Sequence, residues 1–351
     1  MHIDTILIDN IAYTLDEATH TAKVEKNADA GYCGDVVIPE HVSYQGETYR
    51  VTAVGFEAFL NCTRLTSIVI PCSVTELYDR AFEGCTGLTS VRIPHSIRDI
   101  DWNTFTGCAD LTSVVVEQGV PYVGVDMFSC CPSLCSVSLP DSVVEIGAFA
   151  FANDKSLTSI TLPPRVRLIN DMAFYCCNAL TEINIPNTVT FIGDETFCGD
   201  IKLRHITIPS SVTTIGEDAF GSCCSLTSLV IPDSVTHIDH DAFEDCTGLK
   251  SVILSKSITK IARNLFLHCT SLESIVIPDG VSEIGEHAFF DCKSLATISL
   301  PDTLEYIAPY AFDGCEQIET IQVPHGMCSK FRKMPALSPW RDKIVEMTPS
   351  S

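Results

Sequence analysis

The chain has 351 residues, 46% of them hydrophobic, and its 45 acidic residues outnumber the 22 basic ones to give a formal net charge of −23. This charge repels nucleic acid phosphates and anionic membranes, so no nucleic acid partner is expected. No stretch approaches the ~18 uninterrupted apolar residues of a membrane span, so direct membrane insertion is not expected either.

Residues 1–50 precede the regular part of the sequence. Residues 11–15 and 21–25 predict two short strands around a turn, a β-hairpin. Residues 36–39, Val-Val-Ile-Pro, predict a degenerate strand that ends at its proline, and residues 40–50 predict a long return. The first residues lack the basic and apolar regions of a signal peptide, which leaves open both a mature form that lost its leader and a cytoplasmic protein.

From residue 51 to residue 324 the sequence repeats with a fixed period. Phenylalanine recurs every 23 residues, and a leucine follows six residues later in every copy except the last, which has Ile318. Ten copies carry cysteine three residues after the phenylalanine, and Asp154 and Asp200 replace it in the other two. Such a period is typical of a solenoid, in which one unit stacks on copies of itself. The phenylalanines are Phe59, Phe82, Phe105, Phe128, Phe151, Phe174, Phe197, Phe220, Phe243, Phe266, Phe289 and Phe312.

Each unit predicts a strand, a corner and a return segment. In residues 65–70 the inward isoleucines are two apart, which is the period of a strand, and Pro71 ends that strand. Val74 and Leu77 are expected to turn inward on the return side. Several copies then carry a glycine, among them Gly147, Gly193, Gly216 and Gly285. Glycine at this point predicts either a positive φ or a close backbone approach.

Residues 325–351 leave the repeat pattern. Residues 329–333 predict a helical turn, and residues 339–346 are expected to pack Trp340 and Ile344 across the last coil. A solenoid needs such a segment at each end, because its terminal coil has no neighbour to cover its apolar surface.

The signatures L-x-x-I-x-I-P and I-G-x-x-A-F, at this repeat length, resemble the BspA-type repeat of the leucine-rich repeat superfamily. The resemblance implies an α/β-type solenoid, mostly β, forming a right-handed superhelix of twelve 23-residue repeats over residues 51–324. Residues 1–50 are then the N-terminal cap, and residues 325–351 the C-terminal cap.

The same resemblance implies a non-enzymatic scaffold that binds other proteins, including host matrix or cell-surface proteins. The first hypothesis is a secreted or cell-surface protein that acts in adhesion or host interaction. An intracellular, cytoplasmic scaffold or effector is the alternative, and the many cysteines without a pairing pattern favour it.

Two sets of outward residues are candidate binding positions. The stacked strands are expected to present a broad, rigid and weakly polar face: Thr66, Val69, Thr89, Thr112, Val115, Thr158, Thr181, Thr227 and Val230, with Val276 in the valine column. The second set lies off the inward columns of the return side and is large and apolar: Trp102, Tyr122, Phe149, Leu168, Met172 and Phe191. Contiguous exposed apolar area marks an interaction site, for a partner or for self-association, unless a cap or a local bend covers it.

The 18 cysteines predict neither a disulfide framework nor a metal centre. Ten of them share one inward column with parallel Cβ vectors, so these thiols are expected to stay reduced, and no C-x-x-C pair occurs. His237 and His240, with Asp218 and Asp241, are expected to form a solvated polar edge, with a weak divalent-cation site as the alternative. No histidine or acid recurs beside the serines that repeat from Ser67 onward, so no catalytic residue, metal or cofactor is expected.

Overall fold

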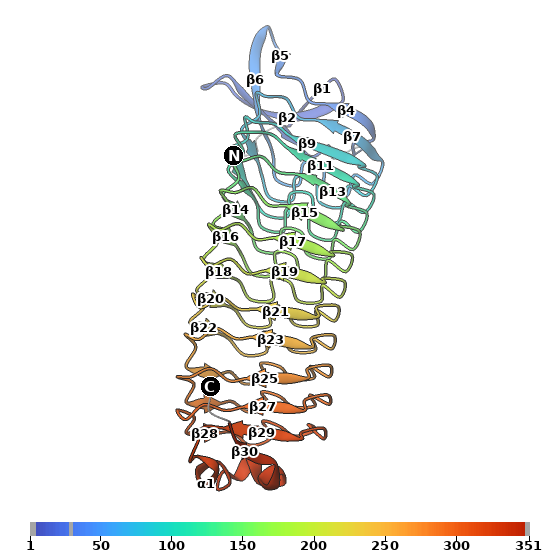
Figure 1. The fold of residues 1–351 in the computed structure, drawn as a ribbon. Coiled ribbons are helices and arrows are strands. Elements are labelled where there is room, and N and C mark those ends of the chain that lie inside the picture. Colours follow the sequence, from blue (N-terminus) through green and yellow to red (C-terminus); the bar gives the residue numbers. More distant parts are fainter. Residues whose placement is uncertain (1–4, 28–30, 348–351) are drawn as a thin grey trace. The chain divides into compact units, whose positions relative to one another are not determined.

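The computed structural model describes residues 5–27 and 31–347, which fall into two compact units, residues 1–178 and 179–351. Each unit is a mostly β solenoid in which the chain returns to the same position every 23 residues, as the sequence predicts (Figure 1). A long strand and a short strand alternate along the chain, and like strands stack in parallel from coil to coil. None of the helices in these two ranges is long and apolar enough to cross a membrane.

The first unit begins with two hairpins. Its first strands are β1 (Ile6–Ile8), β2 (Ile11–Asp16), β3 (Thr21–Glu25), β4 (Gly34–Val37), β5 (His41–Tyr44) and β6 (Glu47–Val54). Strands β2 and β3 form the predicted antiparallel hairpin. Strands β5 and β6 form a second, unpredicted one, where the long return was expected. Its turn places Gln45 (φ 51°) and Gly46 (φ 89°) in the left-handed region, as a two-residue hairpin turn requires.

Two stacks of strands follow in the first unit. The long strands are β7 (Leu65–Val69), β9 (Ser90–Ile93), β11 (Ser113–Val116), β13 (Ser136–Ser138) and β15 (Ser159–Thr161). The short strands are β8 (Glu76–Leu77), β10 (Asp99–Ile100), β12 (Tyr122–Val123), β14 (Glu145–Ile146) and β16 (Leu168–Ile169). The N-terminal strands extend both stacks, because β4 pairs with β7 and β3 pairs with β6, which pairs with β8.

The second unit repeats this arrangement. Its long strands are β17 (Glu182–Asn184), β19 (His205–Thr207), β21 (Ser228–Val230), β23 (Ser251–Ile253), β25 (Ser274–Val276), β27 (Thr297–Ser299) and β29 (Thr320–Val323). Its short strands are β18 (Phe191–Ile192), β20 (Thr214–Ile215), β22 (His237–Ile238), β24 (Lys260–Ile261), β26 (Glu283–Ile284) and β28 (Tyr306–Ile307).

The chain ends in the helix α1 (Cys328–Phe331), the 3-10 helix η1 (Pro335–Lys343) and the strand β30 (Ile344–Glu346). As predicted, a helical turn is present, Ile344 is buried, and the ring of Trp340 meets that of Phe312. Strand β30 pairs with β29 and so extends the long stack. By contrast, no strand in the described ranges pairs with the outer edge of β28, so the short stack stops there.

The core consists of stacked ladders of identical side chains. Ring centroids of successive phenylalanines lie 4.8–5.8 Å apart from Phe59 to Phe174 and 5.2–5.5 Å apart from Phe197 to Phe312. These separations are in the range where aromatic pairs attract. Each coil therefore contributes its buried phenylalanine ring to contacts with its neighbours.

The cysteine column adds hydrogen bonds to this core. The thiol of Cys85, for example, donates to the carbonyl of Phe59 in the preceding coil at 3.1 Å. All eighteen cysteines are unpaired in the structure. Burial raises the pKa of Cys85 to about 12, which makes it an unreactive apolar filler.

Left-handed backbone occurs beside the phenylalanines and not at the predicted glycines. The residue two positions before each phenylalanine has φ between 52° and 62°. Gly147, Gly216 and Gly285 have no positive φ, so that alternative is wrong for them. Instead, a Cβ on Gly147 would lie 2.7 Å from the backbone of Gly124, so glycine is needed because adjacent coils approach closely. Asparagine and aspartate tolerate left-handed backbone, which explains the polar column that includes Asp126.

Candidate binding surfaces

The outward side of the long strands, here called the strand face, carries exposed β-branched residues in the second unit. Val230, Ile253 and Val276 end the adjacent strands β21, β23 and β25, and their exposed fractions are 59%, 64% and 65%. Strand alternation puts their neighbours, such as Leu229, into the core and leaves these three in solvent. They form a contiguous apolar stripe on a rigid sheet.

The strand face of the first unit has a second apolar group. Val37 and Val69 are paired on β4 and β7 and are 62% and 51% exposed. Arg92 on β9 separates them along the stack from Val115, which is 39% exposed. The predicted threonines Thr66, Thr89, Thr112, Thr158 and Thr227 are also exposed, and Thr181 is half-buried.

Two exposed residues of the strand face, Ile253 and Val37, were not among the predicted binding positions. Ile253 occupies the same 23-residue column as Val230, so a search for β-branched residues in place of valine alone would have found it. Val37 precedes Val69 by a spacing other than 23, because the first coil is not in register with the repeat. Periodicity alone carries no signal for it.

The apolar residues of the return side are only partly brought together. Tyr122 and Leu168 begin β12 and β16, but Glu145 lies between them in the ladder. Trp102 is 64% exposed and Leu168 45%, whereas Tyr122 is half-buried and its hydroxyl accepts the amide of Ile100 at 3.1 Å.

Phe149 and Met172 occupy the left-handed column in adjacent coils and are half-buried. Phe191 begins β18 in the second unit and is 37% exposed. The exposed members of this set in the first unit are thus Trp102 and Leu168, which lie on separate, non-adjacent coils and are together called the return-side patch.

The acidic and histidine residues of the second unit form small clusters of potential metal ligands. In the first, Nδ1 of His240 lies 2.6 Å from Asp241 and its Nε2 lies 3.4 Å from Glu217. Both ring nitrogens therefore already have partners, and the His240 side chain is 41% exposed. Two further groups each bring three potential ligands together: Glu195, Cys198 and Asp218, and Glu244, Asp245 and His268.

Proton affinities in these clusters follow from burial and proximity. The hydrogen bond to Asp241 raises the pKa of His240. Burial, which acts to raise the pKa of Asp241, is outweighed by hydrogen bonds from Asn264 and His240, so this pKa is lowered. Burial and the adjacent Asp241 raise the pKa of Glu244 to about 7. The polar atoms around His240 and Asp241 are therefore hydrogen-bonded to one another.

The repeats and these surfaces define a leucine-rich repeat protein. Residues 47–139, 123–250 and 214–333 match the family described as BspA type leucine rich repeat region, and the chain belongs to this family. Among curated protein sequences, none matches the chain.

Solved structures are similar over nearly the whole chain. A leucine-rich repeat protein from Bacteroides ovatus is 28% identical, with a TM-score of 0.68, over 98% of this chain and 100% of that one. A leucine rich cell surface protein from Faecalibacterium prausnitzii is 28% identical, with a TM-score of 0.58, over 95% and 98%. The pneumococcal vaccine antigen PcpA is 17% identical, with a TM-score of 0.59, over 99% of both chains, which shows a common fold.

Proposed function

We propose that this protein is a non-enzymatic scaffold at the bacterial cell surface that binds other proteins, in adhesion or host interaction. The leucine-rich repeat fold is suited to protein binding in general. The surface location is supported by similarity to the cell surface protein from Faecalibacterium prausnitzii. The family match names no catalytic activity, and the clusters around His240 direct their polar atoms at one another.

The stripe of Val230, Ile253 and Val276 carries this proposal. Three adjacent β-branched side chains, each more than half exposed, keep apolar area in water where a serine or threonine would fit equally well. Contiguous exposed apolar area of this kind marks protein interaction sites. A rigid sheet also lowers the entropy lost on binding, because its side chains are already ordered.

The test replaces all three stripe residues with serine, as Val230→Ser, Ile253→Ser and Val276→Ser together. Binding to cultured epithelial cells and to purified matrix glycoproteins should be saturable for the wild type and lost in the triple variant. Its free energy of unfolding should change by no more than about 0.5 kcal/mol per site, because exposed residues contribute little to stability. Ile201→Ser, which alters an apolar residue 42% exposed outside the strand face, is the matched control. Unchanged binding by the triple variant would contradict the role of the stripe.

The cytoplasmic alternative is favoured by one specific observation. Cys33, Cys72, Cys130 and Cys135 are free and exposed, which suits a reducing compartment better than an oxidising one. Fractionation of the native organism, followed by protease treatment of intact cells, separates the two readings. Digestion in intact cells supports the surface location, and protection until lysis supports the cytoplasmic scaffold.

The return-side patch is proposed as a second surface, for a partner or for self-association. Trp102→Ser combined with Leu168→Ser should weaken partner binding or shift the sedimentation coefficient toward the monomer without lowering the melting temperature. Tyr122 is kept in this variant because its hydroxyl accepts a backbone hydrogen bond. A double variant that binds partners and associates like the wild type would exclude this patch.

A further inference from the structure

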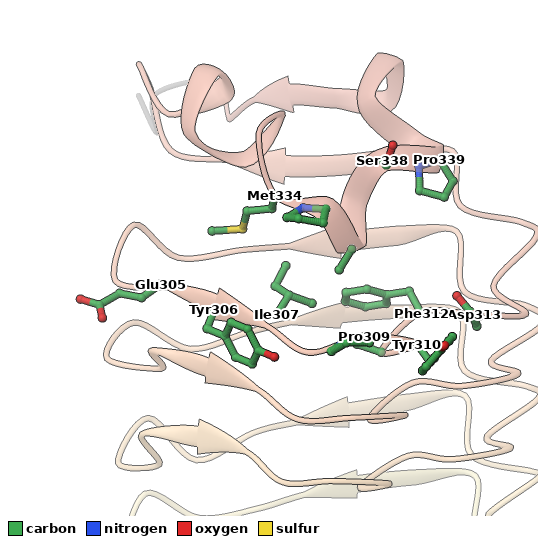
Figure 2. A pocket seen from close by; sticks show the side chains of 13 residues that line it. Glu305, Tyr306, Ile307, Pro309, Tyr310, Phe312, Asp313, Met334, Ser338 and Pro339 are labelled. Carbon is green, nitrogen blue, oxygen red and sulfur yellow. The ribbon is translucent and has the colours of Figure 1, made fainter.

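A cavity of about 510 Å³ lies between the last coil of the second unit and the C-terminal cap. Figure 2 shows Ile307 and Phe312 along the last coil, with Met334, Ser338 and Pro339 of the cap on the opposite side and Glu305 and Asp313 at opposite ends of the row of side chains. The volume is within the range of ordinary ligand sites. The cavity exists because β30 continues the long stack, while no strand of residues 5–27 and 31–347 continues the short one.

The carbonyl groups along this edge have lost their usual partners. In the preceding coil, the carbonyl of Ser282 accepts the amide of Glu305 at 2.9 Å, and that of Ile284 accepts the amide of Ala308 at 2.8 Å. The equivalent carbonyls of the last coil are those of Glu305 and Ile307. Within the described ranges, no group donates a hydrogen bond to either of them.

The amide groups of the same coil are open as well. The amide of Phe289 donates to the carbonyl of Ala311 at 2.8 Å, but the equivalent amide of Phe312 has no acceptor in the part of the chain that the structure describes. The amide of Tyr310 likewise has no acceptor within these residues. A coil edge with both open acceptors and open donors is a template for an additional extended chain.

The side chains of the cavity favour a cationic occupant. Tyr306 and Tyr310 are 52% and 56% exposed, and the ring of Tyr310 is held by stacking on His287, with centroids 5.6 Å apart. The lining has two carboxylates, on Glu305 and Asp313, and contains no lysine, arginine or histidine. Tyrosine faces attract cations, and a guanidinium both stacks on aromatic rings and pairs with carboxylates.

We propose that this cavity, called the groove from here on, binds an extended segment of a partner protein, and that this segment carries arginine. The backbone of the segment pairs with the open carbonyl groups of Glu305 and Ile307. Its arginine side chains lie against Tyr306 and Tyr310 and reach the carboxylates at either end. The inference rests on the proposed protein-binding function and gives it a further attachment point that is chemically distinct from the apolar strand face.

A direct binding assay uses the full chain with Trp102→Phe, which leaves Trp340 as the only tryptophan. Trp340 is a local reporter, because its ring meets that of Phe312 at 6.4 Å between centroids. The probe is a blocked hexapeptide of alternating arginine and valine, titrated at about 0.15 M salt to screen nonspecific attraction. A saturable change in Trp340 fluorescence is expected, whereas a hexapeptide with glutamate for arginine and one with an N-methylated backbone should each give no change.

The variant Tyr306→Ser with Tyr310→Asn should weaken binding of the arginine peptide by roughly tenfold. Asparagine is chosen because it accepts the left-handed backbone of position 310, where φ is 61°. Met172→Asn, in the same left-handed column of the first unit, is the matched control and should bind like the parent. Equal binding by the double tyrosine variant, or by the N-methylated or glutamate peptide, would overturn the proposal. A failure of the strand-face test would leave this result unaffected, because the assay measures the groove alone.

Discussion

The two ends of the chain cover their terminal coils in different ways. At the N-terminus, Tyr32 is buried and its ring lies 4.2 Å from that of Phe59, so the aromatic ladder gains one more member. Strands β3 and β4 continue the short and the long stack respectively. At the C-terminus, Trp340 meets Phe312 only edge-on at 6.4 Å, and β30 continues the long stack alone.

The difference shows that a terminal coil has two separate needs. Its apolar side chains must be covered, and its backbone groups must find partners. The N-terminal cap meets both needs. The C-terminal cap covers Phe312 but leaves the backbone edge of β28 open, which is how an end of a solenoid becomes a candidate binding groove.

The largest expected effect comes from the aromatic ladder at the two ends. Phe59→Ala should lower the free energy of unfolding by about 5 kcal/mol, because the cavity would be enclosed between Tyr32 and Phe82. Phe312→Ala should cost closer to about 3 kcal/mol, because its cavity would open into the neighbouring groove. Equilibrium denaturation followed by circular dichroism measures both values. Equal losses would contradict the difference between the caps.

The polar contacts of the caps should differ in the same direction. The hydroxyl of Tyr32 donates to the carbonyl of Glu25 at 2.6 Å and accepts the amide of Ala12 at 3.1 Å. Tyr32→Phe keeps the ring but leaves the carbonyl of Glu25 and the amide of Ala12 without the hydroxyl. The free energy of unfolding is expected to fall by about 2 kcal/mol. Trp340→Phe should cost less than about 1 kcal/mol, since Trp340 is only half-buried. Thermal unfolding of the two variants tests whether the N-terminal cap depends more on its polar contacts than the C-terminal cap does.

A buried aspartate inside the solenoid provides a comparison with the two ends of the chain. Asp154 replaces a ladder cysteine and is fully buried; its Oδ1 accepts the amide of Cys131 at 2.9 Å, and its Oδ2 has no partner in the described ranges. Burial, together with the nearby Cys131 thiol, raises the pKa of Asp154 well above its usual value. The folded protein therefore keeps this carboxyl protonated up to a higher pH than the unfolded chain does.

Because the folded pKa is the higher one, the stability linked to Asp154 is complete below the unfolded pKa and is lost as the pH rises toward the folded pKa. Asp154→Asn should thus match the wild type near pH 3.5 and exceed it by about 1–3 kcal/mol at pH 7. Urea denaturation at both pH values tests this. A constant difference between the two proteins across the pH range would show that Asp154 does not titrate on unfolding.

The interior of the fold was predictable because every coil repeats the same physical problem. The phenylalanine column recurs in all twelve copies and the leucine column in eleven, so the aromatic ladder and the strand positions are over-determined by the sequence. The hairpin of β5 and β6 was missed because it occurs once and has no counterpart at the 23-residue period. The left-handed columns were missed because they are occupied by residues as different as Arg80, Phe149 and Tyr310, and only the stacking geometry shows what they share.

The candidate surfaces were predictable only in part for a related reason. Strand alternation identifies which residues point outward, so the exposed valines followed from their spacing. It does not say which short strand lacks a neighbour. The groove beside Tyr306 depends on the path of residues 328–346, which turns into helices and rejoins the long stack only. That path has no periodic signal.

The smallest expected effect concerns the ion pair at the end of β30. Glu346 accepts the amide of Gly326 at 3.0 Å and lies 2.6 Å from Nδ1 of His325, whose side chain is 85% exposed. Exposed ion pairs contribute little, and glutamine keeps the acceptor for Gly326, so Glu346→Gln should cost no more than about 0.5 kcal/mol. Ile344→Ala, which truncates the buried residue of the same strand, should cost about 2–4 kcal/mol. If denaturation showed the reverse order, the attachment of β30 to the last coil would depend more on the Glu346 contacts than on the burial of Ile344. The cap would then not be held mainly by its packing against the long stack.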